Sequence, residues 1–228
     1  MITKLSQIVE AARANGAKRL AVAYGQDPHT LRAVHEAFRQ GLVIPTIYGN
    51  RTIIKEVCDA EGIDISDFTI VNETVDVACV AMAVRAVASG EADVLMKGLI
   101  GTATMLRAVL DKQEGLLPSG GTLTHQAVAE WADYGKLLLC CDVAVIPFPT
   151  PQQRRVQVAL AARTCRAMGI DTPRIALIHC SETASDKFPY TTDYAAIIAE
   201  AQRGDYGPCL VDGPLDLRTA IDAKALRI

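Results

Sequence analysis

Short apolar runs alternate with amphipathic segments along nearly the whole chain. The run RLAVAY at residues 19–24 is followed by Asp27 and Pro28, which suit a helix N-cap and a first helical position, and then by an amphipathic stretch that reaches Gln40. Short apolar strands separated by helices are typical of a parallel sheet covered on both faces. We therefore predict an α/β fold. Its first half is expected to hold strands at 19–24, 45–48, 68–71 and 93–96 and helices at 3–15, 28–40, 51–61 and 73–89.

A polar, glycine-rich stretch at residues 111–121 interrupts this alternation. We interpret it as a loop near a cleft. The alternation restarts at Lys136, so we place a domain boundary near Tyr134 and predict two α/β domains, residues 1–134 and 135–228. The second domain is expected to hold strands at 137–141, 175–179 and 209–211 and helices at 152–168, 191–202 and from 215 to 224.

The turn between the strand at 93–96 and the helix at 102–110 is the strongest candidate for a ligand site. Gly98 and Gly101 let the backbone come close to a ligand, and the helix that follows offers unpaired N–H groups and a partial positive charge. Lys97 ends the strand, Thr102 supplies a hydroxyl in the first helical turn, and Arg107 lies one to two turns further on. The pattern therefore suits a phosphate or a carboxylate.

An alternative interpretation of this turn is structural. In it the glycines only make a tight turn, and Lys97 and Arg107 are solvated. Neither the Walker A pattern nor the G-x-G-x-x-G dinucleotide fingerprint occurs in the sequence, so motif spacing alone does not decide between the two interpretations.

Composition limits the functional classes. The net charge is −3 with scattered Lys and Arg, which argues against nucleic-acid binding. The longest mostly apolar run, residues 137–148, is too short for a bilayer span, and we expect a soluble, cytoplasmic protein with no membrane partner. The seven cysteines form no C-x-x-C pair and are expected to be buried thiols. The four histidines lack metal-ligand spacing, so no metal site is predicted.

Five segments resemble the phosphate acetyltransferase and phosphate butyryltransferase family, and the butyryl branch most closely. They are MKGLIGTATMLRAVL (96–110), GTLTH (121–125), KLLLCCDVAV (136–145), MGIDTPRIALI (168–178) and VDGPLDLRTAI (211–221). The resemblance implies an isocitrate dehydrogenase-like architecture, with two α/β domains and an active-site cleft between them. It also implies reversible transfer of a short acyl group between CoA and inorganic phosphate, which gives an acyl phosphate. CoA would be a co-substrate, no cofactor would be tightly bound, and the chain would form a homodimer or a larger homo-oligomer.

The resemblance suggests a role for one residue, and the chemistry of the side chains suggests further candidates. The family's anion-binding arginine corresponds to Arg107. His125, in Leu-Thr-His, is expected either to orient phosphate or contact the thioester oxygen, or to be a structural histidine at the domain junction. Ser181 follows the strand at 175–179 and could contact substrate or cap a turn. Asp212 could reach the cleft or cap the next helix.

One departure from the family pattern concerns the end of the sequence. Family members continue well past the VDGPL segment, and their later part carries a Ser-Arg pair and an Asp that acts as base toward the CoA thiol. This sequence ends at Ile228, and no residue at a matching position replaces that base. We therefore expect a shortened member or a fragment. The alternative function is a non-catalytic protein that binds acyl-CoA or a phosphometabolite.

Overall fold

The computed structural model describes residues 1–131 and 134–222, and the contacts divide the chain into two compact units. One unit is Val9–Gly121, and the other combines Met1–Ile8 with Thr122–Ile228. The predicted boundary near Tyr134 falls inside a hairpin that pairs Gln126–Glu130 with Leu137–Cys141, whereas the compact units keep both strands of the hairpin together. In the described part, no helix is long and apolar enough to cross a bilayer.

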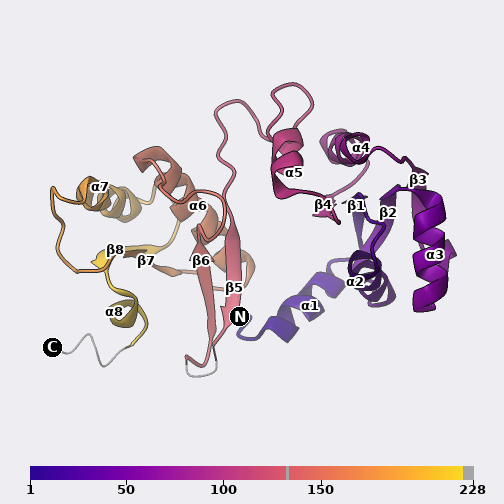
Figure 1. Cartoon of the computed structure of the whole chain (residues 1–228). Helices are drawn as coiled ribbons and strands as arrows, with labels where there is room; N and C mark the ends of the chain where they lie inside the picture. Colours follow the sequence, from indigo (N-terminus) through magenta and orange to yellow (C-terminus); the bar gives the residue numbers. More distant parts are fainter. Residues whose placement is uncertain (132–133, 223–228) are drawn as a thin grey trace. The chain divides into compact units, whose positions relative to one another are not determined.

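A parallel sheet of four strands organises the unit Val9–Gly121. The sheet order is β3-β2-β1-β4, and every neighbouring pair runs parallel (Figure 1). The chain therefore steps outward from β1 to β2 and β3 and then returns to the other side of β1. This confirms the predicted α/β class. The strands are β1 (Lys18–Ala23), β2 (Val43–Gly49), β3 (Thr69–Asn72) and β4 (Val94–Lys97).

Local signals in the sequence fix the helix ends. Asp27 accepts a hydrogen bond from the backbone N of Thr30 at 3.0 Å and so caps the second helix, as predicted. Gly62 ends the third helix in the left-handed conformation that favours glycine. The elements are α1 (Leu5–Ala14), α2 (Pro28–Arg39), α3 (Arg51–Glu61), the short 3₁₀ helix η1 (Ile65–Asp67), α4 (Asp76–Ala88) and α5 (Thr102–Val109).

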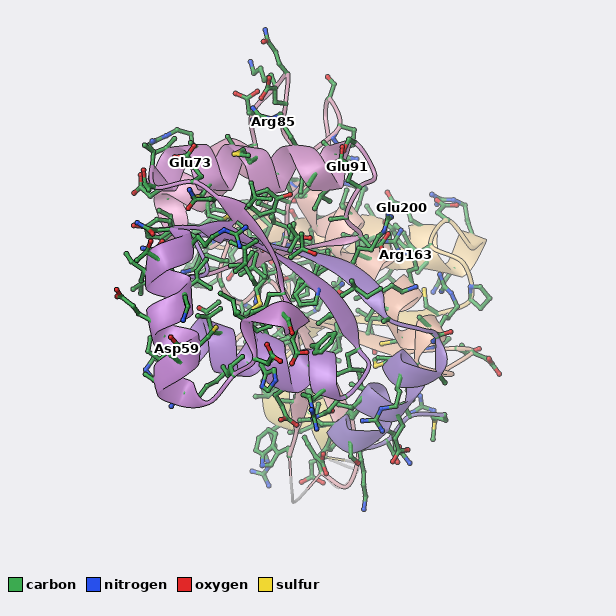
Figure 2. The ribbon with its side chains drawn as sticks, turned by 90° about the vertical axis from the view of Figure 1, so that its right-hand side faces the viewer. Asp59, Glu73, Arg85, Glu91, Arg163 and Glu200 are labelled. Atoms are coloured by element: carbon green, nitrogen blue, oxygen red, sulfur yellow. The ribbon has the colours of Figure 1, made fainter. Side chains whose placement is uncertain are left out.

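Alternate residues of β1 point to opposite faces of this sheet and build two cores. Leu20 and Val22 pack with apolar residues of α2 and α3, whereas Ala21 and Ala23 pack with residues of α4 and α5. Figure 2 shows α4 with Glu73 just before it and Glu91 just after it. Because both faces are covered, ligands can reach the sheet only at its edges, and the carboxyl edge is where α/β sheets bind them.

The other unit contains an antiparallel hairpin and a parallel strand pair. The hairpin β5–β6 was not predicted. Strands were predicted at 175–179 and 209–211, and the structure pairs the corresponding β7 and β8 in parallel. Residues of α6, α7 and both parallel strands form a third core that includes Val158, Leu177 and Ile197. The elements are β5 (Gln126–Glu130), β6 (Leu137–Cys141), α6 (Pro151–Ala167), β7 (Arg174–Ile178), α7 (Pro189–Arg203), β8 (Leu210–Leu215) and α8 (Leu217–Ile221).

Candidate functional site

The carboxyl ends of β1 and β4 form the topological switch point of the four-stranded sheet. The chain leaves β1 toward β2 and leaves β4 toward α5, so the connections after these two neighbouring strands diverge. In open α/β sheets ligands bind in the crevice that such a divergence creates. Residues 97–101, from the last residue of β4 to the N-cap of α5, are the turn predicted from the sequence as an anion site.

Close backbone packing between the two strand ends makes Gly98 necessary. Its N–H donates to the carbonyl oxygen of Ala23 at 2.9 Å, and the next N–H, of Leu99, donates to that of Tyr24 at 3.2 Å. A Cβ atom at Gly98 would lie only 2.4 Å from the Tyr24 oxygen. Tyr24 itself has a positive φ of 56°. The turn after β4 is therefore anchored on the turn after β1.

The first turn of α5 is open to an anion. Gly101 is its N-cap residue, and among the described residues no side chain hydrogen-bonds to this helix end. Gly101 and Thr102 are both exposed. The first N–H groups of a helix have no partner within the helix and carry a partial positive charge. The predicted anion-binding features of Gly101 and Thr102 thus lie together on an accessible surface.

Lys97 has a structural contact that the sequence did not reveal. Its Nζ donates to the carbonyl oxygen of Ile100 at 3.0 Å and lies 3.4 Å from that of Gly98. The ammonium group therefore holds the turn closed from one side. The side chain remains exposed, so it also adds positive charge near α5.

Arg107 is exposed on α5 and makes no hydrogen bond or ion pair with any residue that the structure describes. It lies on the same helix face as Ala103 and Thr104, which precede it by one turn. Helical side chains lean toward the N-terminus of their helix, which is the direction of the first turn from the position of Arg107 in the last turn. The structure thus places Gly98, Gly101 and Thr102 at the N-terminal end of α5, and Arg107 in the last turn of the same short helix.

Asp27 is an acidic group at the same sheet edge, after β1. Its Oδ1 caps α2, but its Oδ2 is buried and has no hydrogen-bond partner among the described residues. Burial alone would raise the pKa of Asp27, but hydrogen bonds from Thr30 and nearby backbone outweigh it and lower the pKa. The residue is therefore a carboxylate near neutral pH.

His125 lies in the other unit, and its backbone is fixed by Asp142. The His125 N–H donates to Asp142 Oδ2 at 2.9 Å, and the hydroxyl of Thr124 donates to the same oxygen at 2.7 Å. Asp142 Oδ1 accepts from the N–H groups of Ala144 and Val145, both at 2.8 Å. The imidazole of His125 is left exposed at the start of β5. The loop position of His125 is therefore rigid while its ring is accessible.

Ser181 and Asp212 lie at different positions along the strand pair β7–β8. Ser181 is exposed beyond the carboxyl end of β7, where its hydroxyl lies 3.4 Å from both the N and the O of Thr183. Asp212 lies within β8, opposite Ala176 of β7, and it accepts a hydrogen bond from the N–H of Gly213. The helix that follows is capped by Asp216 instead, through the N–H of Thr219 at 2.8 Å.

Sequence reasoning missed Asp142 as a site-organising residue. The residue was visible as a single acid that interrupts the apolar run at 137–148, and this was the available signal. Within residues 1–131 and 134–222, no group of three or more His, Cys, Asp or Glu side chains could hold a metal ion.

The sequence matches the family described as phosphate acetyl/butaryl transferase over residues 3–79 and 73–227. The chain belongs to this family. A phosphate butyryltransferase of Clostridium acetobutylicum is 36% identical over 225 residues, which are 99% of this chain and 74% of the relative. A phosphate acetyltransferase of Thermotoga maritima is 31% identical over 223 residues, covering 98% of this chain and 75% of the relative. The family predicted from the five segments is thus confirmed.

Solved structures agree with the fold of this family. A branched-chain phosphotransacylase from Enterococcus faecalis superposes with a TM-score of 0.72 at 25% identity, covering 92% of this chain and 72% of that one. A phosphotransacetylase from Streptococcus pyogenes has a TM-score of 0.80 at 20% identity, covering 99% of this chain and 77% of that one. The second comparison shows a shared fold, because its identity is low.

Proposed function

We propose that this member of the family is a phosphate acyltransferase. It transfers a short acyl group, butyryl or acetyl, reversibly between CoA and inorganic phosphate and produces an acyl phosphate. The observation that carries the proposal is the N-terminus of α5, which has no side-chain cap, together with Arg107 on the same helix, which makes no hydrogen bond or ion pair within the described part of the chain. Membership of the family supplies the reaction class.

Phosphate is the nucleophile in this reaction. One of its oxygens attacks the thioester carbonyl carbon, the C–O bond forms, and the C–S bond breaks. The departing CoA thiolate takes up the proton that phosphate loses. Arg107 and the first N–H groups of α5 hold the other phosphate oxygens and keep them in place. Fixing both reactants in one site supplies roughly 7–11 kcal/mol of the barrier reduction.

The remaining candidate residues are assigned to substrate contacts. His125 orients phosphate or donates to the thioester oxygen, and the rigid loop held by Asp142 supports this role. Ser181, at the carboxyl end of β7, offers a hydroxyl to substrate. Lys97 contributes positive charge beside α5. Asp212 is proposed as a weaker contact, because it lies within β8 and not at the strand end.

Partners and location complete the proposal. CoA acts as a co-substrate rather than as a tightly bound cofactor, and the protein works in the cytoplasm. We also propose a homodimer or larger homo-oligomer. Large apolar side chains are exposed at the start of α4, including Val75 and Val77. Tyr48 of β2 and Met82 of α4 line a surface depression of about 420 Å³. Sedimentation at micromolar concentration tests this, and a stable monomer would contradict it.

The direct test of the enzyme is phosphate-dependent release of thiol from acetyl-, propionyl- and butyryl-CoA. Release that requires phosphate, together with formation of the matching acyl phosphate, is expected. The absence of release with all three substrates at high protein concentration would overturn the proposal. Calorimetric binding of CoA without any turnover would instead indicate an acyl-CoA-binding protein.

A further inference from the structure

Leu99 is an aliphatic side chain that the fold leaves in water beside the candidate phosphate site. It is 67% exposed, which makes it the most exposed leucine in the part of the chain that the structure describes. It lies between Gly98 and Gly101, two residues before the first helical turn begins at the N-cap of α5. The core does not use it, whereas the next residue, Ile100, packs against the core that α4 and α5 share.

Hydrogen bonds fix the backbone on both sides of Leu99. Its own N–H donates to the carbonyl oxygen of Tyr24 at 3.2 Å, and the Ile100 N–H donates to that of Gly98 at 2.9 Å. The second bond closes a three-residue γ-turn with Leu99 at its centre. The ammonium group of Lys97 braces the same turn through the Ile100 oxygen at 3.0 Å. The exposed position of the Leu99 side chain is therefore imposed by a braced turn.

The chemistry of this side chain selects an aliphatic partner. Each methylene group that contact with Leu99 removes from water strengthens an association by up to about four-fold. A polar or charged group gains nothing from the same contact, because it would lose its hydration. Single apolar side chains are common on protein surfaces. Leu99 differs from them because it belongs to the turn that leads into the candidate phosphate site.

Chain geometry places Leu99 within reach of an acyl group at that site. Consecutive Cα atoms are about 3.8 Å apart, so the Cα of Leu99 is at most about 7.6 Å from that of Gly101. In an acyl phosphate the carbonyl carbon is bonded directly to a phosphate oxygen, and the aliphatic chain begins at the next atom. A phosphate held at the first turn of α5 therefore brings the acyl chain into the neighbourhood of Leu99.

We propose that Leu99 contacts the aliphatic chain of the acyl group and gives the enzyme a preference for butyryl over acetyl substrates. The inference rests on the proposed function, because it assigns a specificity-determining residue to that same site. Leu99 takes no part in making or breaking bonds. A butyryl group has two more methylene groups than an acetyl group, so the contact with Leu99 favours it by up to about fifteen-fold.

The test compares kcat/KM for acetyl-, propionyl- and butyryl-CoA in wild type and Leu99→Ala at a fixed phosphate concentration. Leu99→Ala should lose about three- to fifteen-fold with butyryl-CoA, less with propionyl-CoA, and less than about two-fold with acetyl-CoA. Leu99→Met keeps the aliphatic contact and should keep the butyryl preference. Leu110→Ala is the matched control, since Leu110 is a 46% exposed leucine at the other end of α5, and it should leave the three ratios unchanged. A melting curve of each variant confirms that it is folded.

A binding measurement separates the role of Leu99 from the proposed function. Calorimetry should show that wild type binds butyryl phosphate more tightly than acetyl phosphate, and that Leu99→Ala binds the two more nearly alike. An unchanged ratio of these affinities in Leu99→Ala, or an equal fall in kcat/KM for acetyl- and butyryl-CoA, would overturn the role of Leu99. Absence of thiol release from all three acyl-CoAs in wild type would overturn the proposed function alone, and absence of binding of both acyl phosphates to wild type would overturn both.

Discussion

Asp142 Oδ2 accepts hydrogen bonds from both the Thr124 hydroxyl and the His125 N–H, and so joins its own loop to residues that precede it by 18 and 17 positions. Its other oxygen accepts two N–H groups of its own loop. Burial alone would raise the pKa of Asp142, but these hydrogen bonds dominate and hold it well below its usual range. The ionised carboxylate is thus the form that organises the start of β5.

We expect Asp142→Asn to destabilise the chain and to weaken activity through His125. The amide keeps one oxygen acceptor but presents N–H groups where donors already point, so at least one hydrogen bond is lost, at about 0.5–1.5 kcal/mol each. The partial exposure of Asp142 places the effect in the lower part of that range. Urea unfolding measures the change. Thr124→Val should reproduce part of it, and equal stability of all three proteins would contradict the prediction.

Because of Asp93, the folding stability of the chain should depend measurably on pH in the acid range. The hydrogen bond from Arg19, with Nη2 to Oδ1 at 2.6 Å, is the main reason that its pKa falls to about 2. The pKa of an unfolded aspartate is about 3.9. Because the folded value is lower, the contribution of Asp93 to stability is present above about pH 4 and is lost as pH falls toward 2. Carboxyl ¹³C titration measures the pKa, and Arg19→Gln should return it toward 3.9.

Gly98→Ala and Gly101→Ala are matched substitutions at two positions of the same turn. A Cβ at Gly98 would meet the Tyr24 oxygen at 2.4 Å, whereas at Gly101 the nearest atom is the Thr104 hydroxyl oxygen at 3.9 Å and φ is −61°. Gly98→Ala should therefore cost about 1–3 kcal/mol of unfolding free energy, and Gly101→Ala should change it by less than about 1 kcal/mol. Denaturant unfolding of both variants measures the two changes in unfolding free energy. A loss in Gly101→Ala as large as in Gly98→Ala would contradict the assigned turn geometry.

The sequence was sufficient for the elements whose ends carry local signals. Asp27 and Pro28 begin α2, and Gly62 ends α3, because caps act through neighbouring backbone groups. The hairpin β5–β6 was missed because residues 131–136 contain none of the tight-turn pairs, such as Asn-Gly, that predict a hairpin. Strand order also had to come from the structure, since pairing depends on distant segments.

The candidate site likewise contains features that the sequence predicted and contacts that only the structure shows. The open first turn of α5 followed from the glycines of the turn and from helix geometry. The contact of Lys97 with the Ile100 carbonyl could not be predicted, because it depends on how the turn folds back. The role of Asp142 depends on donors from a loop that is distant in the sequence. Residue type alone does not identify the partner in either contact.

Arg107 gives the sharpest test of the phosphate site. A guanidinium group can hold two phosphate oxygens with its planar fork, and lysine keeps the charge but loses the fork. Losing one charge-assisted hydrogen bond of roughly 1.5–3 kcal/mol weakens phosphate binding about ten- to a hundred-fold in Arg107→Lys. Arg107→Ala should weaken it further. Melting temperatures should barely change, because the side chain is exposed and makes no hydrogen bond or ion pair with the described residues.

Arg39→Ala is the matched control for this experiment. Arg39 is also exposed on a helix, but it lies in the last turn of α2, away from the open first turn of α5. Its replacement should leave phosphate affinity unchanged. Phosphate titrations of wild type and the three variants, each with a melting curve, measure the effect. Equal phosphate affinity in wild type and Arg107→Ala would remove Arg107 from the site, and a large fall in melting temperature would make it a structural residue instead.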